Sequence, residues 1–197
     1  MDLKLVGIVI AGLAIVFVIF IIAMLIGSYN GMVTLDQKVS ASWSEVENQY
    51  QRQADLIPNL TSIVSSAVNM ETKFVKDVID ARTKWLGATS VAQKDQAGLE
   101  MNQSLATFVS AIATNEAYPT LQSNKQYTAL MDEVAGTQNR IATSRGRFIE
   151  NIQEYNTTIK VIPNNFLSGM FGFSEREYYK ATAPLTTAPI GDGKLPQ

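Results

Sequence analysis

Three polar residues occupy positions where the sequence predicts a helix core, and they are the side chains best placed to do chemistry. Glu71 interrupts one run of apolar residues at seven-residue intervals, and Gln138 and Arg145 interrupt a second. The apolar members of these runs are Ile57, Val64, Val78 and Trp85, and Met131, Ile152 and Ile159. A buried carboxylate and a buried guanidinium are tolerated only as a pair, so we predict that Glu71 contacts Arg145 with Gln138 nearby. Such a contact would fix the register of the helices.

A second interpretation of the same three residues stays open. A helix has about 3.6 residues per turn and drifts against a strict seven-residue repeat. The drift would turn Glu71, Gln138 and Arg145 toward solvent, where they need no partner. The groups that surround Arg145 in the folded chain separate the two interpretations.

The residue types needed for most catalysis or metal binding are missing from the sequence. The chain has no cysteine and no histidine, which excludes thiolate nucleophiles, Cys/His metal sites and the usual general base. It also lacks a Gly-x-Ser-x-Gly elbow, a Gly-x-x-x-x-Gly-Lys phosphate loop and an Asp-x-Asp-x-Asp-Gly calcium loop. A net charge of −2 gives no field for nucleic acid. We therefore predict no enzyme activity, catalytic residue, metal, cofactor, nucleic-acid partner or small-molecule substrate.

The N-terminal segment has the composition of a membrane-spanning helix. No charged residue occurs from Leu5 to Ile26, and about 22 residues at a rise of about 1.5 Å match the ~30 Å hydrocarbon core of a bilayer. A cleaved signal peptide has a shorter apolar run and a small-x-small site, which residues 23–26 do not supply. We predict a retained single-pass anchor over residues 5–27, after a short flank of residues 1–4.

Small residues gather on one face of this anchor. Gly7, Ala11 and Ala14 are three or four residues apart and share a helix face. Such a face lets two membrane helices approach closely and predicts a packing face for a homo-oligomer, although small residues are also common in spans that do not associate. Lys4 and Lys38 lie at opposite ends of the span, so the positive charges leave its orientation undecided.

Beyond the anchor, the spacing of apolar residues predicts four helices and no strands. Pro58 lacks a backbone N–H and predicts a helix break, either a kink or a tight turn. Ser90 with Gln93, and Ser123 with Gln126, are each spaced as a capping box that opens a helix. The fold class is therefore all-α: an N-terminal transmembrane helix followed by an elongated antiparallel four-helix bundle over residues 28–180.

Two segments near the C-terminus differ from the helical pattern. Residues 181–197 are rich in Pro, Thr, Ala and Gly without apolar periodicity, which predicts a disordered tail. Residues 163–173 are aromatic and interrupted by glycine. This segment either caps the end of the bundle or presents Phe166, Phe171 and Phe173 to a partner or the membrane surface.

A series of short motifs extends from the span to Tyr179. The motifs are Tyr29-Asn30, Ala41-Ser42-Trp43, Arg52, Asp55-Leu56-Ile57-Pro58-Asn59-Leu60, Glu71, Ala81-Arg82, Tyr118-Pro119, Ser123-Asn124, Asn139-Arg140-Ile141-Ala142, Arg145, Tyr155-Asn156, Pro163 and Phe171-Gly172-Phe173. In this order they resemble the LemA family of bacterial membrane proteins. The chain departs from the family pattern at Gln138, where a Glu is usual, and at Phe148-Ile149, where Tyr-Asn is usual. The resemblance implies a LemA-like bundle behind one span and a bacterial origin. It also implies relatives associated with HtpX-type membrane proteases, TPM-domain proteins or magnetosome formation.

Two functions fit these features. The first is a non-catalytic scaffold or adaptor in the bacterial cytoplasmic membrane, which binds a membrane or envelope protein such as a membrane protease. The alternative is a self-assembling architectural protein that organises or remodels the bilayer through its span or its aromatic segment.

Overall fold

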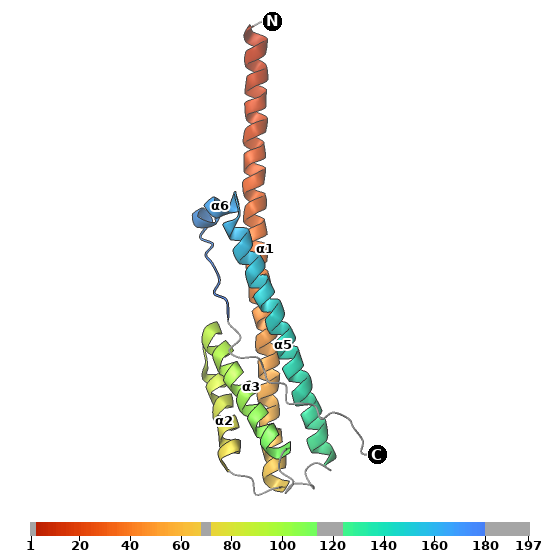
Figure 1. The fold of residues 1–197 in the computed structure, drawn as a ribbon. Helices are drawn as coiled ribbons and strands as arrows, with labels where there is room; N and C mark the ends of the chain where they lie inside the picture. The colour runs from red at the N-terminus through yellow and green to blue at the C-terminus, as the bar shows by residue number, and fades with distance from the viewer. Residues whose placement is uncertain (1–2, 68–71, 114–123, 180–197) are drawn as a thin grey trace, which may run out of the picture. The chain divides into compact units, whose positions relative to one another are not determined.

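The computed structural model describes residues 3–67, 72–113 and 124–179, and these residues confirm the predicted all-α fold (Figure 1). No strand occurs within those ranges. The helices are α1 Leu3–Ala67, α2 Thr72–Gly87, α3 Val91–Ala113, α5 Lys125–Lys160 and α6 Asn164–Phe171. The predicted disordered tail over residues 181–197 lies outside the described residues, as does Glu71.

The chain divides into two compact units, and two of its helices contribute to both. Unit 1 comprises Met1–Ser42 and Arg147–Tyr178, and unit 2 comprises Trp43–Gly146 and Tyr179–Gln197. Each unit has its own buried side chains, because α1 and α5 place apolar residues inward in both. The two units are therefore described one at a time.

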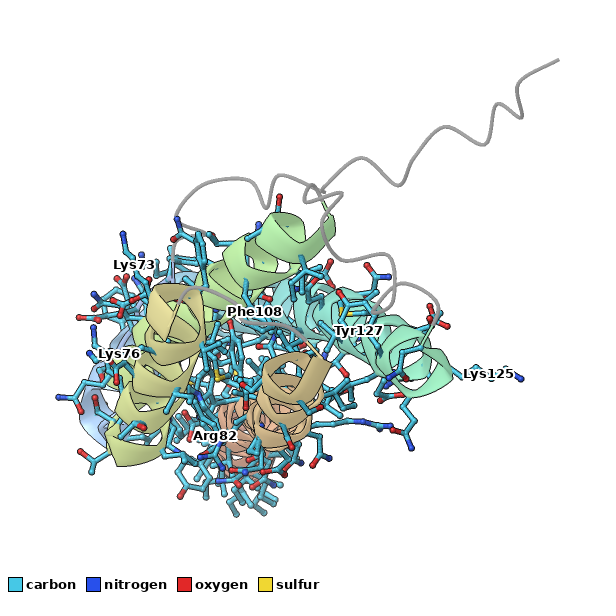
Figure 2. All side chains as sticks on the ribbon, turned by 90° about the horizontal axis from the view of Figure 1, so that it is seen from below. Lys73, Lys76, Arg82, Phe108, Lys125 and Tyr127 are labelled. Carbon is cyan, nitrogen blue, oxygen red and sulfur yellow. The ribbon has the colours of Figure 1, made fainter. Side chains whose placement is uncertain are left out.

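Unit 2 is the four-helix bundle. It is built from the C-terminal part of α1, from α2 and α3, which pack against each other, and from the N-terminal part of α5. Viewed from its end, Phe108 lies among the four helices, whereas Lys125 points away from them (Figure 2). The seven-residue pattern identified most of this core, because Ile57, Val64, Val78, Trp85, Tyr127, Val134 and Ile141 are buried, whereas Met131 is only half-buried.

Polar caps define where two bundle helices begin. At the start of α3, Ser90 Oγ accepts from the Gln93 backbone N–H at 3.2 Å, and Gln93 Oε1 accepts from the Ser90 backbone N–H at 3.4 Å. This reciprocal pair confirms the predicted capping box. At the start of α5, Asn124 Oδ1 accepts from the Gln126 N–H at 2.9 Å, so Asn124 is a cap. The other predicted cap, Ser123, lies outside the described residues.

Unit 1 combines the N-terminal part of α1 with the C-terminal part of α5 and with α6. Its apolar interior is formed by Met32, Val39, Phe148, Ile152, Tyr155, Ile159 and Leu167. The first part of α1 is long and apolar enough to cross a membrane, and its apolar window is not buried against the rest of the chain. Side chains such as Leu13 and Phe17 are therefore exposed, as the lipid-facing residues of a membrane helix would be.

Candidate functional site

The most unusual feature of unit 2 is an ion pair inside the bundle. Arg145 of α5 pairs through Nη1 with Oδ1 of Asp95 on α3, and the side chains are only 10% and 6% exposed. The same Nη1 lies 3.3 Å from the hydroxyl oxygen of Tyr50 on α1, which accepts a hydrogen bond from it. The pair therefore joins three helices through one guanidinium. Charged hydrogen bonds shielded from water are stronger than neutral ones, so this contact resists displacement of the helices.

Tyr50 is held in place on every side. Its ring is fully buried and its centroid lies 6.4 Å from that of Trp85. A Cβ added to Gly98 of α3 would stand 2.7 Å from Tyr50 Cζ, so the ring lies directly on the backbone of α3. Burial raises the pKa of the Tyr50 hydroxyl, and the charge of Arg145 opposes that rise. The hydroxyl is therefore neutral at physiological pH and acts as a structural hydrogen-bonding group.

A second polar contact lies in the same bundle. Gln53 Nε2 of α1 donates to Asn102 Oδ1 of α3 at 2.9 Å, and both residues are buried. Gln53 Oε1, Asn102 Nδ2 and Thr137 Oγ1 are buried within the described chain without a hydrogen-bond partner from it. Unsatisfied buried groups cost free energy. The Gln53–Asn102 contact joins α1 to α3 and fits a role in selecting one helix arrangement.

The predicted trio of Glu71, Gln138 and Arg145 is only partly described. Arg145 is buried and takes Asp95 as a partner, whereas Glu71 lies outside the described residues, so its pairing stays a prediction. Gln138 is half-buried, and its neighbour Thr137 occupies the fully buried position. Asp95 is the residue that sequence reasoning missed. Its signal was its helical spacing with Gly98, Asn102 and Leu105, which are also buried.

α1 continues through Pro58 to Ala67. Of the two outcomes predicted for Pro58, the tight turn is therefore wrong, and the kink stays a prediction. Proline has no N–H for the carbonyl four residues earlier, which here belongs to Ala54. Arg82 of α2 supplies the missing donor, and its Nε lies 2.7 Å from the Ala54 carbonyl oxygen. A side chain from a neighbouring helix thus replaces the lost backbone hydrogen bond, and the helix persists. The motifs Leu-Ile-Pro-Asn-Leu and Ala-Arg meet at this contact.

A double-mutant cycle tests this replacement. Arg82→Met leaves the buried Ala54 carbonyl without a donor, and we expect the free energy of unfolding to fall by about 1–3 kcal/mol. Pro58→Ala restores a backbone N–H, so Arg82→Met should cost clearly less in that background, with a coupling of at least about 0.5 kcal/mol. Urea unfolding of the full chain in detergent micelles, followed by circular dichroism, measures all four proteins. Additive losses would show that Arg82 does not replace the proline's missing donor.

The aromatic segment of unit 1 folds back onto α1. Gly172 ends α6 with a φ of 78°, a left-handed conformation that side chains other than glycine rarely adopt. This turn lets Phe171 and Phe173 both reach Tyr29, with ring centroids 5.1 and 5.8 Å away. In the Phe-Gly-Phe motif, the glycine thus forms the turn and the phenylalanines on either side of it both contact Tyr29. Phe166 is placed differently, because it is 69% exposed.

The chain after α6 is clamped to unit 1 by polar contacts. Asn156 Nδ2 donates to the Arg176 carbonyl oxygen at 2.8 Å, and the Arg176 N–H donates to Asn156 Oδ1 at 2.9 Å. The Arg176 side chain also pairs with Asp36 of α1 at 2.7 Å. The Tyr155 hydroxyl donates to the Ser174 carbonyl oxygen at 3.0 Å. The segment that follows Gly172 is therefore fixed to both α1 and α5.

The predicted packing face of the span is open in the structure. Gly7, Ala11 and Ala14 are exposed, and a Cβ added to Gly7 would have no heavy atom within 4 Å. Across residues 3–67, 72–113 and 124–179, no group of three or more Asp or Glu residues is arranged to hold a metal ion. The buried contacts Asp95–Arg145 and Gln53–Asn102 each join one helix to another.

These features define the class of the protein: a helical bundle with buried polar contacts between its helices, attached to an apolar helix suited to a membrane. The LemA family matches residues 42–190, and the chain belongs to that family. It is 26% identical over 211 residues to the magnetosome proteins MamQ 1 and MamQ 2 of Paramagnetospirillum magneticum, over 93% of this chain and 78% of each relative. It is 25% identical over 202 residues to the magnetosome protein MamQ of Magnetospirillum gryphiswaldense, over 89% of this chain and 74% of that relative.

Both the relatives and the fold bear on membrane association. The relatives are magnetosome proteins, and the N-terminal part of α1 has the length and composition of a membrane span. Together they indicate that this protein associates with a membrane.

Proposed function

We propose that this protein is a non-catalytic, membrane-anchored scaffold that binds a membrane or envelope protein. The observation that supports it is the use of the buried polar side chains. Arg145 pairs with Asp95 and donates a hydrogen bond to Tyr50. Arg82 donates to a backbone carbonyl, and Gln53 donates to Asn102. Groups that could act on a substrate thus stabilise a defined helix arrangement, which is the property a scaffold needs. On this proposal the span over residues 5–27 anchors the protein in the bacterial cytoplasmic membrane.

The outer face of α2 is the part of unit 2 best suited to a protein partner. Ile79 and Leu86 are 42% and 44% exposed and, at a seven-residue separation, lie on the same side of the helix. Neighbouring exposed apolar residues are typical of binding surfaces. A membrane protease, or another envelope protein, is the kind of partner that would contact this face.

Site-specific photocrosslinking in native membranes tests the proposal. A photoreactive residue at position 79 or 86 should yield an adduct with the same partner, which mass spectrometry identifies. The matched control is position 77, because Asp77 is also exposed on α2 and lies about 200° around the helix from Ile79. The adduct at position 79 should disappear in Leu86→Ser, since that change removes half of the surface. Adducts formed only with a second copy of the chain, or equally from all three positions, contradict a scaffold that docks through this face.

The alternative is a self-assembling architectural protein, and one observation favours it. The small residues Gly7, Ala11 and Ala14 form an open face on the span, and relatives of this chain are magnetosome proteins. Energy transfer between labelled full-length copies in vesicles measures self-association directly. On this alternative Gly7→Ile and Ala14→Ile lower the transfer, whereas Leu13→Ile, on a different face, does not. Vesicles without a partner should also change shape.

A further inference from the structure

Large apolar side chains on α6 and just before it are exposed rather than packed against the rest of unit 1. Phe166 and Met170 of α6 are 69% and 77% exposed, and because they are four residues apart they lie on one side of the helix. Ile162, which lies just before α6, is 78% exposed. The buried residues Leu167 and Ser168 lie on its other side. Three neighbouring apolar side chains this exposed are unusual on a surface that faces only water.

The position of α6 along the span identifies what covers this surface. Phe171 packs edge-on against Tyr29, and Tyr29 follows Ile26, the last residue of the charge-free apolar run, by three positions. At a rise of about 1.5 Å per residue, Tyr29 lies about 4.5 Å beyond the end of that run. The headgroup layer is about 5–8 Å thick on each side of a bilayer. Within unit 1, α6 lies beside α1 (Figure 1). If the apolar run spans the bilayer, the contact between Phe171 and Tyr29 places the end of α6 at the level of the headgroup layer.

The charges around α6 exclude binding by simple attraction to anionic lipid. Lys160 pairs with Glu175 at 2.8 Å, Arg176 with Asp36 at 2.7 Å and Lys38 with Glu154 at 2.6 Å. Each pair is neutral as a whole, so this part of unit 1 presents no excess positive charge to a membrane surface. Contact with lipid must therefore come from apolar burial, which does not require a charged headgroup.

We propose that α6 is an interfacial membrane helix whose exposed side chains Ile162, Phe166 and Met170 insert into the same bilayer that holds the span. The Phe-Gly-Phe turn presses the helix against Tyr29, and the clamp at Asn156 fixes the chain that follows it. The protein then contacts lipid at two places, through the span and through α6. This surface is distinct from the α2 face of the proposed scaffold, so either proposal can fail without the other.

Single-cysteine labelling of the full chain tests the proposal, because the sequence contains no cysteine. Nitroxide labels are placed at Phe166→Cys and Met170→Cys in protein reconstituted into phosphatidylcholine vesicles, and collision with oxygen and with a water-soluble nickel complex is measured. Leu13→Cys in the span gives the lipid reference. Asn165→Cys, an exposed polar position on the same helix, gives the water reference.

Labels at 166 and 170 should be shielded from nickel and should report a depth of about 5–10 Å into the interface. The depth should not change when a third of the lipid is replaced by anionic phosphatidylglycerol. Met170→Asp should return the label at 166 to water while circular dichroism stays unchanged, since the side chain at 170 makes no buried contact. If the labels at 166 and 170 are as accessible to nickel as the label at 165, the proposal is wrong. Shielding that appears only when a second protein is added contradicts it equally.

Discussion

Asp95→Ala lowers the free energy of unfolding by about 3–5 kcal/mol, the largest loss we expect from a single polar substitution in this chain. The change removes the partner of Arg145 and leaves a guanidinium that is only 10% exposed among three helices. Tyr50 can accept one hydrogen bond from it but cannot neutralise its charge. Urea unfolding of the full chain in detergent micelles, monitored by circular dichroism, measures the loss.

The double substitution Asp95→Leu with Arg145→Met separates a broken ion pair from a damaged core. Because two apolar side chains of similar size carry no desolvation cost, the double variant should regain most of the stability that Asp95→Ala loses. The matched control is Asp80→Ala, which breaks the exposed pair with Lys76 on α2 and should leave the unfolding midpoint unchanged. Equal effects of Asp95→Ala and Asp80→Ala would show that the pair with Arg145 is not shielded from water.

Gly98→Ala should destabilise the bundle by about 1–3 kcal/mol, although alanine is the better helix former. The new methyl group would stand 2.7–2.8 Å from three carbons of the Tyr50 ring. The ring cannot move away, since it is fully buried and its hydroxyl is bonded to Arg145. The overlap should therefore outweigh the gain in helix propensity. The same urea unfolding experiment measures it.

Gly146→Ala is the control for this prediction. Gly146 also lies inside a helix, but an added Cβ has no heavy atom within 4 Å, so this change should stabilise by up to about 1 kcal/mol. Tyr50→Leu should make Gly98→Ala less harmful by removing the ring. If both glycine substitutions stabilise the protein, the close approach of α3 to Tyr50 is not a constraint.

The sequence predicts the helices well because their signals are local and repeat along the chain. The charge-free run before Gly27 marks the apolar part of α1, and the seven-residue series ending at Trp85 marks buried residues. The start of α3 follows from Ser90 and Gln93, since a capping box involves residues only three apart. Patterns of this kind require no knowledge of the neighbouring helix.

Predictions from the sequence are wrong or incomplete where a residue far along the chain supplies the partner of a side chain or backbone group. Pro58 predicts a break because its own helix offers no donor for the Ala54 carbonyl, and only the folded chain brings Arg82 there. Asp95 was overlooked for a similar reason. One acidic residue on a helix usually faces water, and its partner Arg145 lies 50 positions further along the chain. Contacts between helices, rather than helix formation itself, are what local patterns leave out.

The hydrogen bonds between the Asn156 side chain and the backbone of residue 176 depend on the residue type at position 156 alone. The Asn156 side chain bonds to the backbone N–H and carbonyl groups of residue 176, and every amino acid except proline offers both groups. This contact is therefore preserved as long as Asn156 is retained, whichever residue other than proline stands at position 176. Position 156 must remain an amide of that length, whereas the side chain at position 176 takes no part in this contact and pairs instead with Asp36.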